Sequence, residues 1–78
     1  GFEVGVVTHA LAQHWFDVTV TGEEAHGGSA MAGRRDALMA AAELITKIER
    51  AALDAGARAT VGRITAQPDS RNVVPGQV

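Results

Sequence analysis

The sequence predicts an α+β fold in which an antiparallel sheet carries one long helix on one face. Three observations predict it. Apolar and polar residues alternate from His14 to Thr21, apolar residues recur at helical spacing from about Ala32 to Ala55, and turn-forming residues separate two further extended segments. Elements in this order are typical of a small α+β layer.

The first part of the chain predicts two extended segments. Residues 1–7 combine apolar side chains with two glycines, which suits a short extended segment rather than a helix. The stretch His14–Thr21 is a strand with one apolar and one mostly polar face, as expected in an antiparallel sheet covered on one side. Trp15, on the polar face, is the exception.

One long helix is predicted at about Ala32 to Ala55, and Gly56 supplies a left-handed stop. The apolar stripe of this helix consists of Met31, Leu38, Ala41, Ile45, Ile48 and Ala52. Charged residues occupy the opposite side.

The last part of the chain predicts two more strands. Residues 58–66 form the first, in which Gly62 allows a bulge or a close backbone approach. A turn at Gln67–Arg71 leads to the second, Asn72–Val78, where Pro75 suits the start or the edge of a sheet. Strand, helix, strand and strand, with a right-handed crossover, make the first half of a ferredoxin-like split βαβ unit.

Length and composition exclude several classes of protein. The 78 residues form one domain at most, and a chain of this size buries only about 60 to 65% of its unfolded surface. The absence of cysteine excludes disulfides and favours a cytoplasmic location. A net charge of −2 with scattered basic residues argues against nucleic acid as a partner, and no apolar run reaches the ~20 residues of a membrane span.

The candidate site lies where the strand pattern gives way to the helix pattern. His26 is followed there by Gly27, Gly28 and Ser29, and a helix N-terminus at this point would offer backbone N–H groups to an anion or a developing oxyanion. The same residues allow a second interpretation. The glycines would then only make a tight turn, Ser29 would cap the helix, and His26 would be solvated.

Two further observations concern binding residues. Asn72 opens the last extended segment, where its amide either binds a ligand or closes the preceding turn. His9, His14 and His26 lack the i, i+4 spacing of a zinc helix, and no carboxylate cluster complements them, so no metal site is predicted within the chain. We therefore expect the chain to catalyse no reaction by itself.

Taken together, several short motifs resemble one family. They are Gly5–Thr8, Trp15–Gly22, Ala25–Gly28, Met31, Arg34–Leu38, Val61–Ile64 and Asn72–Gly76. In this order they resemble the lid, or dimerisation, domain of the N-carbamoyl-L-amino-acid hydrolase and allantoate amidohydrolase group. That group belongs to the dinuclear-zinc aminoacylase and carboxypeptidase family.

The resemblance implies that residues 1–78 are a single fragment of the lid in a two-domain enzyme. Two divalent metal ions, zinc or else manganese or cobalt, would bind in a separate catalytic domain outside this fragment. Lids of this group pair across a two-fold axis, so the resemblance implies a homodimer. The substrate would be a small N-carbamoyl amino acid or an allantoate-like ureido acid.

The resemblance also implies roles for four residues. The histidine matching His26 reaches the partner subunit's active site and donates to the carbonyl oxygen as the tetrahedral intermediate forms. Asn72 binds substrate, and the turn at Gly27 and Gly28 lines the same cleft.

Two alternatives remain open. The alanine-rich helix and an exposed strand edge also suit a passive dimerisation module that contributes no residue to an active site. A peptidase or N-deacylase lid of the same family would differ only in its substrate.

Overall fold

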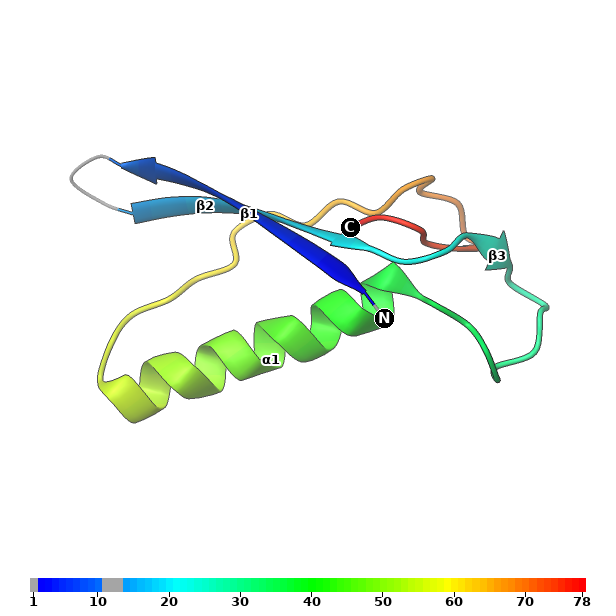
Figure 1. The fold of residues 1–78 in the computed structure, drawn as a ribbon. Coiled ribbons are helices and arrows are strands. Elements are labelled where there is room, and N and C mark those ends of the chain that lie inside the picture. The colour runs from blue at the N-terminus through cyan, green and yellow to red at the C-terminus, as the bar shows by residue number, and fades with distance from the viewer. Residues whose placement is uncertain (1, 11–13) are drawn as a thin grey trace.

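The computed structural model describes residues 2–10 and 14–78 (Figure 1). Within them it contains two small antiparallel sheets and one helix, which confirms the α+β class. In chain order the elements are β1 (Glu3–Ala10), β2 (His14–Thr21), β3 (Ala25–His26), α1 (Ala37–Ala55) and β4 (Val73–Val74).

Strands β1 and β2 form an antiparallel ribbon. The pairing runs from Glu3 opposite Thr21 to Ala10 opposite His14. The predicted bounds of β2 are confirmed, whereas β1 continues to Ala10, beyond the predicted segment 1–7. Because side chains alternate along a strand, Val4 and Val20 lie on the same face of the ribbon.

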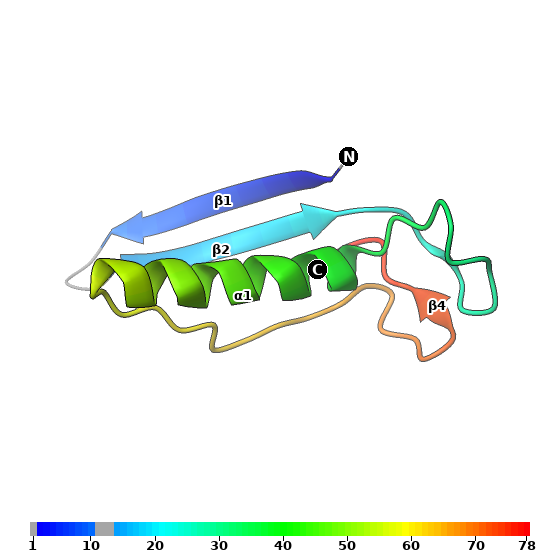
Figure 2. The same cartoon turned by 90° about the horizontal axis from the view of Figure 1, so that it is seen from below.

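Helix α1 covers this face along β2 and leaves much of β1 uncovered (Figure 2). The contact is built from small side chains, which let the helix approach the strand closely. The core consists of Val20, Ala37 and Ala41, with Ala40, Leu44 and Val78 packed against it.

The start of the helix differs from the prediction. Helix α1 begins at Ala37 rather than at about Ala32, because the carboxylate of Asp36 accepts hydrogen bonds from the backbone N–H groups of Leu38 and Met39, at 3.0 and 3.3 Å. Met31, predicted on the buried stripe, precedes the helix and is 78% exposed. The predicted end is confirmed.

Gly56 terminates the helix in the left-handed conformation, with φ 65°. Its N–H group bonds to the carbonyl oxygen of Leu53 at 3.3 Å, and that of Ala57 bonds to the carbonyl oxygen of Ala52 at 2.9 Å. These bonds pair the last carbonyl groups of the helix.

The predicted strand at residues 58–66 is not formed. The segment runs back from the end of α1 toward β4 without a ladder to any described strand, and pairing starts only at Gln67, opposite Gln77 (Figure 2). Val61 and Ile64 are exposed as a result. A favourable residue pattern makes a strand only where a second strand lies beside it.

The C-terminal residues add a short third row to the ribbon. Val20 and Val78 exchange two backbone hydrogen bonds, of 2.8 and 3.0 Å, and Gly22 N–H donates to the carbonyl oxygen of Gly76 at 2.8 Å. This pairing holds the segment after β4 against β2 and so fixes where β4 lies.

Candidate functional site

A second, very short ladder positions His26. Strand β3 pairs with β4 so that Ala25 lies opposite Val74 and His26 lies opposite Val73. Val74 is buried, whereas His26 is exposed. The sequence predicts a loop at Ala25–His26, because two residues are too few to show a strand pattern.

The turn after His26 is held by three backbone N–H groups. Gly27 N–H donates to the carbonyl oxygen of Asn72 at 2.6 Å, and Ser29 N–H donates to the carbonyl oxygen of His26 at 2.9 Å. Gly28 N–H donates to Nδ1 of the His26 ring at 2.9 Å. The turn therefore binds both the ring of His26 and the backbone of Asn72.

Close approach explains both glycines. A Cβ atom on Gly27 would lie 3.0 Å from the carbonyl oxygen of Asn72, and one on Gly28 would lie 3.1 Å from Nδ1 of His26. Neither glycine is among the residues with positive φ. A side chain at either position would be in tight contact, so the neighbouring group would have to shift by a few tenths of an ångström.

The bond from Gly28 selects the tautomer of the His26 ring. Since Nδ1 accepts a hydrogen bond, the neutral ring carries its hydrogen on Nε2. His26 is thus an exposed donor with a fixed ring position. Chemically, such a group can donate to a carbonyl oxygen or to the oxyanion derived from it.

Asn72 closes the turn before β4, which is one of the two roles that its sequence position allows. Its backbone binds the turn at Gly27, and its side-chain Oδ1 accepts a hydrogen bond of 2.6 Å from Ser70 Oγ. The second bond closes the turn before β4. The amide nitrogen is the end of the side chain that can donate to a ligand.

The helix N-terminus is not part of this site, contrary to the sequence prediction. Helix α1 begins at Ala37, and its first N–H groups bind Asp36. Ser29 is therefore not the helix cap; its Oγ is buried and has no hydrogen-bond partner in the described part of the chain. The turn at Gly27 and Gly28 is confirmed, but its amide donors belong to the turn and not to a helix.

Arg34 is a member of the site to which sequence analysis gives no role. Its guanidinium group donates to three backbone carbonyl oxygens of the segment that follows His26, those of Gly27, Ser29 and Ala30. In the sequence, Arg34 is part of the one adjacent basic pair, with Arg35, and of the motif Arg34–Leu38 that contributes to the family resemblance. Its partners are backbone atoms, which leave no pattern of residue types.

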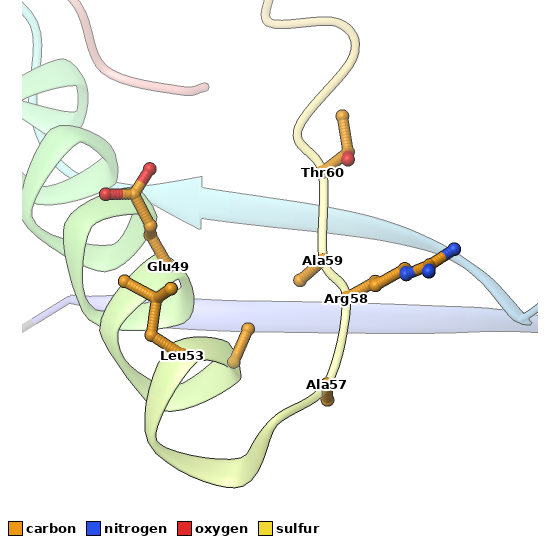
Figure 3. A pocket seen from close by; sticks show the side chains of 7 residues that line it. Glu49, Leu53, Ala57, Arg58, Ala59 and Thr60 are labelled. Atoms are coloured by element: carbon orange, nitrogen blue, oxygen red, sulfur yellow. The ribbon is translucent and has the colours of Figure 1, made fainter.

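The two pockets along helix α1 are separate from His26. One is lined by Glu43, Thr46, Lys47 and Arg50. The other lies between the end of the helix and residues 57–60, with Glu49 and Leu53 on the helix side (Figure 3). None of the predicted site residues lines either pocket.

Two further properties bear on ligands and location. In residues 2–10 and 14–78, no group of three or more His, Cys, Asp or Glu side chains could hold a metal ion. Helix α1, the one helix in those ranges, is not long and apolar enough to cross a membrane.

Comparisons with known proteins place these features in a family context. Residues 12–78 match the model of the peptidase dimerisation domain. The chain is 40% identical to an N-carbamoyl-L-amino-acid amidohydrolase of Rhizobium meliloti and 37% identical to an allantoate amidohydrolase of Bacillus subtilis, over 97% and 100% of its length. It is also 48% identical, over 97% of its length, to an uncharacterised hydrolase of Haemophilus influenzae.

The chain spans about a fifth of the length of these relatives, 19% to 20%. No solved structure matches it significantly.

Proposed function

The chain belongs to the peptidase dimerisation domain family, and on that premise we propose that it is part of the lid of a metal-dependent amidohydrolase. The reaction is hydrolysis of a linear amide C–N bond in an N-carbamoyl amino acid or an allantoate-like ureido acid. With a carbamoyl amino acid, the products are the free amino acid, ammonia and carbon dioxide. The activities for which two relatives are named support this substrate class.

His26 acts in this reaction as a hydrogen-bond donor. The observation that carries this proposal is the 2.9 Å bond from Gly28 N–H to Nδ1, which leaves the hydrogen of the neutral ring on Nε2. When water adds to the carbonyl carbon, negative charge develops on the carbonyl oxygen. A donor fixed at that position stabilises the tetrahedral intermediate more than the substrate, which lowers the barrier.

The active site served by His26 is that of the partner subunit in a homodimer. His26 is exposed and lines neither pocket along α1, so the ring is accessible to a partner subunit. Gly27 and Gly28 line the same cleft as His26. Asn72 binds substrate through its amide nitrogen, which has donors to offer while Oδ1 accepts the bond from Ser70.

The metal ions belong to the catalytic domain and not to this chain. Two divalent ions, zinc or else manganese or cobalt, would activate the hydrolytic water there. The described side chains offer no cluster that could hold an ion.

Replacing His26 in the full-length enzyme tests its role. We expect His26→Ala to lower kcat by about 10²-fold or more and to leave the metal content unchanged, because one oxyanion donor is lost. His26→Gln, whose amide nitrogen can approach the position of Nε2, is expected to retain more activity than His26→Asn. Unchanged turnover in His26→Ala would remove this residue from the mechanism.

Hybrid dimers test whether His26 acts on the partner. An inactive catalytic-domain variant is mixed with His26→Ala, and the subunits are exchanged. Each hybrid then has one complete site, so activity should recover to about a quarter of the wild-type value, since about half of the dimers are hybrids. No recovery would show that His26 does not act across the dimer.

A passive dimerisation module is the second candidate. It is favoured by the large apolar side chains exposed on the β1–β2 ribbon, among them Val6 and Phe16, because such surfaces suit association. In that case His26→Ala would leave kcat unchanged and only changes to the interface would reduce activity. If the chain were instead the lid of a peptidase or an N-deacylase, His26 would have the same role. Only the substrate that the full-length enzyme hydrolyses would distinguish this case.

A further inference from the structure

The side chain of Arg34 forms hydrogen bonds with three carbonyl groups of the turn that holds His26. Nη2 donates to the carbonyl oxygen of Gly27 at 2.8 Å and to that of Ser29 at 2.6 Å, and Nε donates to that of Ala30 at 3.2 Å. The guanidinium group suits this arrangement because its donors lie in one rigid plane. Arg34 is half-buried.

These bonds lie on both sides of Gly28, whose amide donates to the histidine ring. Gly28 lies between two residues whose carbonyl groups Arg34 binds, and its own N–H group binds Nδ1 of His26. Three carbonyl dipoles that converge on one point repel one another unless a cation lies between them. Without the guanidinium group, we expect the turn to open and the bond to Nδ1 to weaken.

We propose that Arg34 is a positioning residue for His26, which keeps the ring in the Nε2–H form and in a fixed place by holding the turn from Gly27 to Ala30. This inference rests on the proposed function of His26. Arg34 acts in this scheme through the turn, to which its Nη2 and Nε donors are directed, and not by binding substrate.

The test compares Arg34→Ala, Arg34→Lys and a control in the full-length enzyme. Arg50→Ala is the control, because Arg50 is exposed on α1, thirteen residues and roughly 20 Å beyond the first residue of the helix. We expect Arg34→Ala to lower kcat by about ten- to a hundredfold with KM changed less than about twofold, because a displaced donor loses much of its effect. The kcat of Arg34→Lys should lie between those of the wild type and Arg34→Ala, and Arg50→Ala should have the wild-type kcat.

A double variant tests whether Arg34 acts through His26. If it does, His26→Ala combined with Arg34→Ala should have the same kcat as His26→Ala alone. Methylguanidine, added to Arg34→Ala, should restore part of the lost kcat and should not affect Arg50→Ala. Hydrogen exchange of the amides at residues 27–29 should be faster in Arg34→Ala, with helix α1 unchanged.

The outcomes separate this inference from the proposed function. Wild-type turnover in His26→Ala overturns the proposed function and the positioning role with it. If His26→Ala is impaired, wild-type kcat in both Arg34 variants overturns the positioning role alone. Multiplicative losses in the double variant, or a rise in KM without a fall in kcat, also overturn it, because Arg34 would then act independently or bind substrate itself. If Arg34→Ala does not fold, the same comparisons are made with Arg34→Lys.

Discussion

Two regions of the molecule are organised in opposite ways. The loop end, residues 22–36 with 67–78, is held by specific backbone contacts between distant segments, such as Glu23 N–H to the carbonyl oxygen of Arg35 at 2.8 Å and Gly27 N–H to that of Asn72 at 2.6 Å. The ribbon, β1 with β2, has a regular ladder, but most of its large apolar side chains are exposed; Val6 is 55% and Phe16 is 58% exposed.

The difference shows which part of the chain is held in position by its own contacts. At the loop end, each segment is placed by hydrogen bonds that need one particular distance, so His26 has a defined position without a large core. On the ribbon, the backbone is defined but most side chains have few contacts. We expect substitutions at the loop end to be costly and substitutions of exposed side chains on the ribbon to be tolerated.

The largest effect on stability is expected at Gly22. A Cβ atom there would lie 2.1 Å from the carbonyl oxygen of Arg35, so the two segments must separate. Gly22→Ala should lower the free energy of unfolding by about 3 kcal/mol, measured by denaturant titration. Gly5→Ala on the ribbon is the matched control, because a Cβ atom there meets nothing within 4 Å. Equal losses in the two variants would contradict the comparison.

A smaller effect is expected at the start of helix α1. Asp36→Ala removes the acceptor of the N–H groups of Leu38 and Met39 and should cost about 1 kcal/mol. Asp36→Asn keeps an acceptor oxygen and should lose much less. Glu43→Ala, a change at an exposed position within α1, serves as the control in thermal unfolding. If Asp36→Ala were as stable as Glu43→Ala, another residue would be the cap.

The smallest effect is expected on the ribbon. Val6→Thr should change the free energy of unfolding by less than about 0.5 kcal/mol, because this side chain is already exposed. The same change at Val20, which is 3% exposed, places a hydroxyl group in the core and should cost about 1 to 3 kcal/mol. Similar losses at the two positions would mean that β1 is covered in the folded protein.

Elements whose signals are local could be predicted from the residues alone. Strict alternation predicted β2, and Gly56 predicted the end of α1, because each depends on the residues of that element alone. The sequence also brought His26, Gly27, Gly28 and Asn72 to attention, from their residue types and from the family resemblance. Their catalytic and binding roles remain predictions.

Strand pairing, the start of the helix and the contacts of Arg34 depend on where the folded chain places its segments, so only the folded chain shows them. Segment 58–66 has the pattern of a strand but has no strand beside it among the described residues, so it stays unpaired. Helix α1 starts at Ala37 and is capped by Asp36, not by Ser29, because Asp36 is the residue whose carboxylate binds the amides of Leu38 and Met39. Pairing of β3 with β4 joins His26 to Asn72, and Arg34 reaches backbone carbonyl groups, whose positions no residue pattern encodes.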